Sequence, residues 1–148
     1  MTSDESTDLK EVIYINQSAH NDYEAMPPDI KEAADQAITQ IQNEKPLPAK
    51  MFKPLKENLS GIDEVVLPYD SDTYRVYVAL YKSAIYILDA GIKKSKTGHE
   101  IPPNQKERLI RRRDQASKDY DTNKAEIERF ALARKAKRDY LIKIGAEI

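Results

Sequence analysis

The chain has 148 residues, no cysteine, and a formal net charge of −1 from 24 basic and 25 acidic side chains. This length suits one domain with a single core, and the lack of cysteine excludes disulfides, zinc–thiolate centres and cysteine nucleophiles. No apolar run approaches the roughly 18 residues of a membrane span, and the acidic, polar start does not resemble a signal peptide. We therefore expect one cytoplasmic domain without membrane contact.

The charge is distributed unevenly along the chain. Residues 1–43 hold 2 basic and 9 acidic groups (−7), residues 44–118 hold 15 and 10 (+5), and residues 119–148 hold 7 and 6 (+1). A basic middle segment can attract polyanions even in a nearly neutral molecule, because salt screens the field of distant charges. The alternative is a set of ordinary solvated surfaces.

The first third of the chain predicts a disordered start, a strand and two helices. Residues 1–8 are polar and acidic, which indicates disorder. Residues 12–15 are β-branched and aromatic, which predicts a strand that ends at Asn16. Apolar residues at helical spacing predict a helix over 28–43, and a shorter one over 49–59 that is interrupted by Pro54.

Three strands with short connections follow, at residues 62–69, 73–81 and 84–90, and they predict an antiparallel meander. In the second of these strands, the alternation of side chains places Arg75 on the opposite face from Val76 and Val78.

The remainder predicts a cation-rich loop over 91–100, a charged helix over 104–120, a break at 121–123 and a last helix over 124–143. The last helix has a broad apolar stripe, and it could cap the body, pair with a second copy or receive a segment of a partner protein. The order of elements predicts an α+β fold of two layers, with the helices on one face of the sheet.

Several features in the second half of the chain occur in the same order in one known family. They are Glu64, the Tyr74-Arg75-Val76 run, the turn at Ile87 to Ala90, the Lys-Lys-Ser-Lys-Thr-Gly run at 93–98, and Pro102 or Pro103 before a basic helix. Over about residues 11–120 the chain resembles the phage-derived HigB-like toxins of the RelE/ParE superfamily. The resemblance implies a RelE-like toxin domain over 9–120, after residues 1–8 and before a C-terminal helical extension over 121–148.

This resemblance implies the toxin half of a type II toxin–antitoxin pair, which cleaves mRNA in the ribosomal A site. It also implies a helix-turn-helix antitoxin (HigA-like) as partner, and neither metal nor organic cofactor. Metal-free RNA cleavage uses the 2′-hydroxyl of the substrate as nucleophile, so the protein mainly has to orient the phosphate and offset the charge of the transition state.

Cationic side chains are the candidates for these two roles. We expect Arg75 to stabilise the transition state and Lys93 and Lys94 to bind the phosphate, since the arginine fork can donate two parallel hydrogen bonds. The candidates for further RNA contacts are Lys96, His99, Arg108 and Arg112. Alternatively, Arg75 forms an ion pair with Asp63 or Glu64 on the sheet, and His99 is a solvated loop histidine without a catalytic role.

The chain departs from the family pattern at two places. It has Val65 and Val66 where many relatives carry arginine or lysine, and Asp89 where they carry histidine. An aspartate beside a phosphate site is unfavourable unless it acts as a base or pairs with Lys93 or Lys94. Two other functions therefore stay open: a non-catalytic toxin fold that binds an antitoxin or another protein target, as ParE does, and simple binding of nucleic acid.

Overall fold

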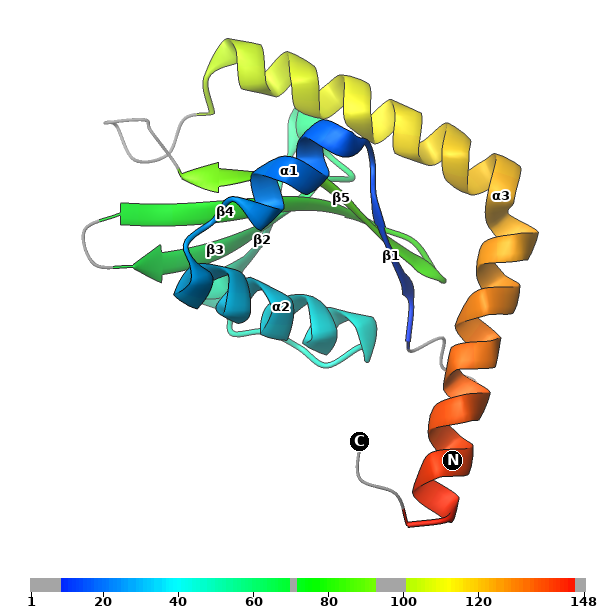
Figure 1. Cartoon of the computed structure of the whole chain (residues 1–148). Helices are drawn as coiled ribbons and strands as arrows, with labels where there is room; N and C mark the ends of the chain where they lie inside the picture. Colours follow the sequence, from blue (N-terminus) through cyan, green and yellow to red (C-terminus); the bar gives the residue numbers. More distant parts are fainter. Residues whose placement is uncertain (1–8, 70–71, 93–100, 146–148) are drawn as a thin grey trace.

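The computed structural model describes residues 9–69, 72–92 and 101–145, and its centre is a five-stranded sheet (Figure 1). The strand order is β1-β5-β4-β3-β2. Strands β3 (Asp63–Tyr69), β4 (Asp72–Leu80) and β5 (Ala84–Ile92) form an antiparallel meander, and β1 (Glu11–Tyr14) pairs with β5 in parallel. The predicted α+β class, the first strand and the meander are confirmed. The disorder predicted for residues 1–8 lies outside the described residues, as does most of the predicted cationic loop.

Helix α1 (Gln17–Glu24) was not predicted, because Asn16 was interpreted as the end of a strand and not as the start of a helix. The Asn16 side chain accepts a hydrogen bond of 2.8 Å from the backbone N–H of Ala19, which is the usual action of an N-cap. The helix buries Ala19 and Tyr23. Only a short apolar stripe is needed for eight residues, so the helical pattern was too brief to recognise.

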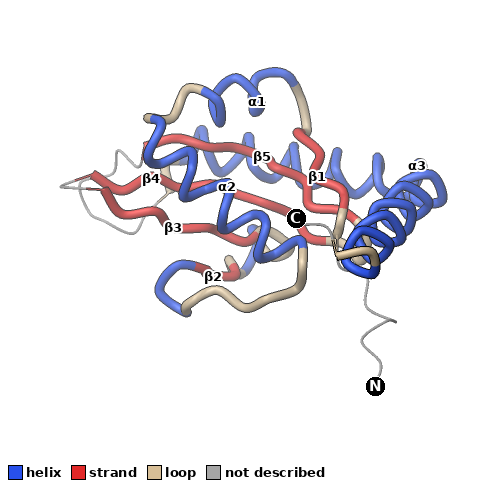
Figure 2. Tube along the Cα trace, turned by 60° about the horizontal axis from the view of Figure 1, so that its bottom comes forward, coloured by secondary structure: helices blue, strands red, loops and turns tan. Residues whose placement is uncertain are grey.

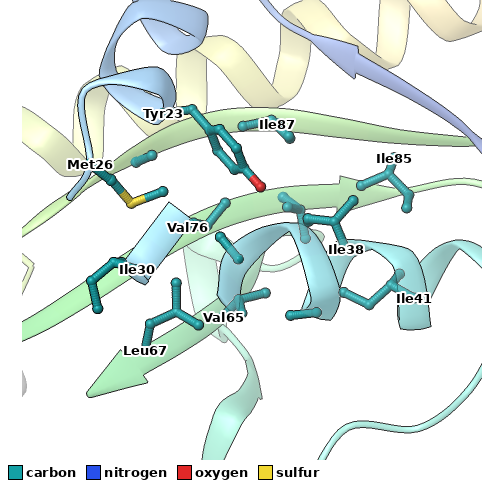
Figure 3. Close-up of a cluster of buried hydrophobic side chains, with 14 residues drawn as sticks. Tyr23, Met26, Ile30, Ile38, Ile41, Val65, Leu67, Val76, Ile85 and Ile87 are labelled. Atoms are coloured by element: carbon teal, nitrogen blue, oxygen red, sulfur yellow. The ribbon is translucent and has the colours of Figure 1, made fainter. Parts of the chain in front are cut away.

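Helix α2 (Pro28–Gln42) is confirmed almost to its predicted ends. Its apolar stripe packs on one face of the sheet and forms the first core with α1 (Figure 3). The side chains labelled there come from the two helices, the connection between them and the strands: Tyr23, Met26, Ile30, Ile38, Ile41, Val65, Leu67, Val76, Ile85 and Ile87. The apolar side chains that alternate along the strands therefore pack against those at helical spacing in α2, and together they form one apolar layer.

The helix predicted over 49–59 is wrong. The segment consists of a single 3₁₀ turn (η2, Ala49–Met51), the edge strand β2 (Phe52–Pro54) and a second 3₁₀ turn (η3, Glu57–Leu59). Pro54 has no N–H, so it is unfavourable inside a helix and tolerated at the edge of a sheet. Phe52 lies opposite Val65 of β3, where it packs against the first core.

Helix α3 (Pro103–Lys143) is one element of 41 residues, so the break predicted at residues 121–123 is wrong. Tyr120 and Ile127, on either side of those residues, are both buried against the body, and their packing outweighs the modest helix propensity of Asp, Thr and Asn. The helix bends as it runs past the sheet and then extends beyond it (Figure 1). None of the described helices combines the length and apolar character that crossing a membrane requires.

Helix α3 covers the face of the sheet opposite to α2 (Figure 2). A second core lies between α3 and the sheet, made of Tyr86 and Leu88 of the sheet and Leu109, Ala116 and Tyr120 of α3. The described helices thus cover both faces, whereas the sequence placed them on one. An apolar stripe shows that a helix packs on a sheet, but it does not show on which face.

An irregularity in β5 decides what faces α3. Tyr77 of β4 lies opposite Asp89, but its neighbour Val78 lies opposite Ile87, so Leu88 is an extra residue. Such a β-bulge changes the direction of the side chains that follow. Leu88 belongs to the core under α3, and Asp89 contacts arginines of α3, so two consecutive residues face the same helix.

Candidate functional site

A group of charged side chains lies between the sheet and the first half of α3, and we call it the α3-side cluster. Its members are Glu64 of β3, Arg75 of β4, Asp89 of β5, and Arg108 and Arg112 of α3. Of the five, all but Arg108 are buried. Buried charges are found in proteins when they are paired, and here each carboxylate has an arginine partner.

Arg75 and Glu64 form the first pair. The strand register places Arg75 opposite Val66, so Glu64 is its diagonal neighbour on the same face of the sheet. Arg75 Nη1 lies 2.9 Å from Glu64 Oε1, and the two residues are 8% and 5% exposed. This is the ion pair that the sequence offered as the alternative to catalysis, and in this arrangement Arg75 does not present its fork to solvent.

Asp89 is the centre of the second part of the cluster. Arg108 donates to Asp89 Oδ2 from Nε at 3.2 Å and from Nη2 at 2.7 Å, and the Gln105 side-chain amide donates to the same oxygen at 3.2 Å. Arg112 Nη1 lies 3.7 Å from Asp89 Oδ1. The aspartate that departs from the family pattern is therefore compensated by two arginines of α3. Pairing with Lys93 or Lys94 lies outside the described residues.

Burial shapes the electrostatics of the cluster. Desolvation lowers the pKa of Arg112, and the nearby Asp89 carboxylate opposes that shift. Arg112 also donates to the backbone carbonyl of Leu88 at 2.8 Å, which satisfies that oxygen at the bulge. Between the two parts lies Tyr77, whose pKa is raised by burial and by the adjacent Glu64, so its hydroxyl stays protonated.

A pocket of about 660 Å³ opens beside the cluster, where β5 ends and α3 begins. We call it the β5–α3 pocket. Arg108, Gln105 and Asn104 line it from α3, Gly91 and Ile92 line it from β5, and Met26 and Pro27 line it from the α1–α2 connection. Arg108 leaves 36% of its side chain exposed, so it is the arginine of the cluster that a ligand in this pocket can reach.

The structure brings together three of the predicted site residues and leaves four undescribed. Arg75, Arg108 and Arg112 all lie between the sheet and α3. Lys93, Lys94, Lys96 and His99 lie outside the described residues. The sequence missed Gln105 and the link from Asp89 to α3. The spacing of Gln105, Arg108 and Arg112 by three and four positions could have shown that they share a helix face.

Residues 21–114 match the model of a family of phage-derived Gp49-like proteins. The chain belongs to this family. The match covers more than half of the chain and includes the meander and every member of the α3-side cluster. The resemblance to a phage-derived family that the sequence motifs suggested is confirmed. The second half of α3 lies beyond the matched residues.

Among solved structures, this Gp49-like chain is similar to a chain of the RelBE2 toxin–antitoxin complex from Mycobacterium tuberculosis. The two are 22% identical, the alignment covers 57% of this chain and 98% of the other, and the TM-score is 0.43. An overlap this loose does not bear on function. No curated protein sequence matches the chain significantly.

Proposed function

We propose that this Gp49-like protein is the toxin of a type II toxin–antitoxin pair and that it cleaves mRNA on the ribosome. The ordered motifs that resemble phage-derived HigB-like toxins, from Glu64 to Pro103, fall within the residues that match the family. The structural observation that carries the proposal is the β5–α3 pocket, because a charge-compensated arginine and two amide side chains face it from one helix.

The pocket has the size and the donors for a nucleotide. Its volume of about 660 Å³ falls within the range of small-molecule sites, roughly 300–1,000 Å³. Arg108 is held by Asp89 through Nε and Nη2, and the side-chain amides of Asn104 and Gln105 lie one turn away. A held guanidinium loses less conformational freedom when it binds a phosphate, which favours binding.

The proposed reaction requires cations that stabilise the transition state and side chains that orient the phosphate. The 2′-oxygen attacks the phosphorus, the bond to the 5′-oxygen breaks, and a cyclic phosphate remains on the upstream fragment. One proton leaves the 2′-hydroxyl and another is taken up by the departing 5′-oxygen. We assign the stabilisation of the negatively charged transition state to Lys93, Lys94 and Arg108, with Lys96 and His99 as further RNA contacts. No metal or organic cofactor is part of the proposal.

Arg75 takes a different place in this scheme from the one the sequence suggested. Direct contact with the phosphate would require Glu64 to release it, and both are buried. Its described position favours a positioning role, because the pair fixes β3 to β4 on the face that carries Asp89, two strands away from Glu64.

Controlled expression of the full chain tests the proposal. We expect growth arrest together with new mRNA 5′ ends inside reading frames, and cleavage by purified protein on ribosomes in the presence of a chelator. Arg108→Ala and Lys94→Ala should relieve both effects. Arg111→Ala is the matched control, because Arg111 is an exposed arginine on the same helix and does not line the pocket. Full toxicity of both the Arg108→Ala and the Lys94→Ala chains would remove this site.

A second candidate is a toxin fold that binds a protein target without cutting RNA. The observation that favours it is the internal pairing of the cluster: Glu64 uses Arg75, and Asp89 uses Arg108 and Arg112. Growth arrest with intact transcripts would support this candidate. Both candidates include an antitoxin of the helix-turn-helix kind, and co-purification with the product of a neighbouring reading frame would test that partner.

A further inference from the structure

The second half of α3 projects past the sheet, and we call residues 124–143 the α3 arm (Figure 1). Within the described part of the chain, one face of the arm contacts the body. Ile127 and Ala131 are buried there, and Arg134 Nη2 donates to both carboxylate oxygens of Glu11 at 2.9 and 2.7 Å. These contacts fix the rotation of the arm about its own axis, so they also decide which residues it presents elsewhere.

A neighbouring face of the arm carries an exposed stripe with heptad spacing, which continues to the residue after the arm. Its residues follow one another at steps of four and three, and we call them the arm stripe: Glu126, Phe130, Ala133, Lys137, Tyr140 and Ile144. All six are exposed, with Phe130 at 53%, Tyr140 at 60% and Ile144 at 57%. Alternating steps of four and three are the pattern by which one helix packs along another. The stripe lies outside residues 21–114.

We propose that the arm stripe binds the arm stripe of a second copy of this chain, with the two helices antiparallel. The argument is charge complementarity in one register. When Phe130 of each copy faces Ala133 of the other, Glu126 of each copy faces Lys137 of the other. Both pairings then occur twice about a two-fold axis, as an isologous interface requires.

The same register satisfies the packing rules of antiparallel helices. Counting Phe130 as heptad position a makes Lys137 and Ile144 a positions and Glu126, Ala133 and Tyr140 d positions. The Phe130–Ala133 and Glu126–Lys137 layers then each pair an a residue with a d residue of the partner. A parallel pair in register would instead place Glu126 against Glu126 and Lys137 against Lys137, and like charges in facing positions are unfavourable.

The strength of this interface follows from its composition. Phe130 against Ala133 is a large-to-small contact that removes an exposed aromatic ring from water. The Glu126–Lys137 pairs are on the surface and contribute little net affinity, so they select orientation rather than supply strength. A contact of a few helical layers predicts a weak dimer that forms as concentration rises.

Sedimentation equilibrium of the full chain over a series of concentrations is the test. We expect a monomer–dimer equilibrium. Glu126→Lys or Lys137→Glu should raise its dissociation constant about tenfold, because each change places two pairs of like charges opposite each other in the dimer. The double variant Glu126→Lys/Lys137→Glu exchanges the charges and should restore the dimer. Glu128→Lys is the matched control, because it reverses a charge on the arm outside the stripe.

Cysteine chemistry tests the orientation independently, because the chain has no cysteine of its own. Under mild oxidation, a mixture of Glu126→Cys and Lys137→Cys chains should form mixed disulfide dimers, while each variant alone should not. Circular dichroism should show that every variant keeps its helix. Three results would each overturn the proposal. The chain could stay monomeric at every concentration, Glu126→Lys could leave the dissociation constant unchanged, or Glu126→Cys chains alone could form disulfide-linked homodimers.

Discussion

Glu64 and Arg75 form an ion pair of 2.9 Å beneath α3, with only 6% and 10% of their side chains exposed. Two strands bring them together, although eleven positions separate them in the chain. Both charges have left water, and each depends on the other for compensation. A residue that sequence motifs assign to catalysis is therefore also part of what holds the sheet together, and its variants must be interpreted with that in mind.

Removing one partner of this pair should destabilise the fold. We expect Arg75→Ala to lower the free energy of unfolding by about 3–5 kcal/mol, because it leaves Glu64 buried and uncompensated. Replacing both partners, as in Arg75→Met/Glu64→Leu, should recover most of that loss, since apolar residues of similar volume pack without desolvating a charge. Urea denaturation measures both. A single variant as stable as the unmodified chain would contradict the buried pair.

The two arginines around Asp89 should differ in their contribution to stability. Arg112 is buried and donates to the Leu88 carbonyl at 2.8 Å, so Arg112→Leu should cost about 2–3 kcal/mol through unsatisfied polar groups. Arg108 is partly exposed, and without it Arg112 and Gln105 still contact the buried Asp89 carboxylate, so Arg108→Ala should cost about 1–2 kcal/mol. Thermal unfolding followed by circular dichroism gives the order. This order also makes Arg108 the better residue for functional tests, since Arg112 still compensates Asp89 after its loss.

Two neighbouring apolar residues of the α3 arm should differ in how much they contribute to the free energy of unfolding. Ile127 is 6% exposed against the body, and Ile127→Ala should lower the free energy of unfolding by about 2–5 kcal/mol. Phe130 is 53% exposed, and in dilute solution Phe130→Ala should change that free energy by less than about 0.5 kcal/mol. Equal losses for the two variants in urea denaturation would show that the arm packs differently.

Ionisation of Asp63 should lower the free energy of unfolding of the chain as the pH rises through the pKa of this carboxyl. Burial raises the pKa of this carboxyl above its ordinary value of 3.8. The folded state therefore favours the protonated form, and that stabilisation is present below the ordinary pKa and is lost as pH rises through the raised one. Asp63→Asn should be more stable than the unmodified chain at neutral pH, and the difference should shrink as pH falls toward the ordinary value.

The matched control for this prediction is Asp72→Asn, which changes an exposed aspartate at the start of β4. Urea denaturation at a series of pH values measures both variants against the unmodified chain. A constant difference between Asp63→Asn and the unmodified chain across the whole series would contradict the raised pKa.

Local patterns in the sequence predicted the helices and strands whose residues follow a regular repeat of apolar positions. Alternation in 73–81 indicated that Arg75 leaves the face of Val76 and Val78, and the structure confirms this because pleating acts residue by residue. The spacing of Ile30, Ala34 and Ile41 predicted α2 for the same reason. By contrast, α1 and β2 were missed, since eight and three residues are too few for a periodic signal and their form depends on the capping Asn16 and on pairing with β3.

The sequence by itself determined the strands of the meander, the main helix of the first core and the face of the sheet on which Arg75 lies. The tertiary structure alone decided the partners of the charged residues. Glu64 was one of two acids within reach of Arg75, and the strand register chose it. Asp89 turned toward Arg108 and Arg112 because a bulge rotated it onto the α3 face, and α3 crosses that face. Periodicity describes how one segment is oriented, whereas an ion pair depends on how two segments meet.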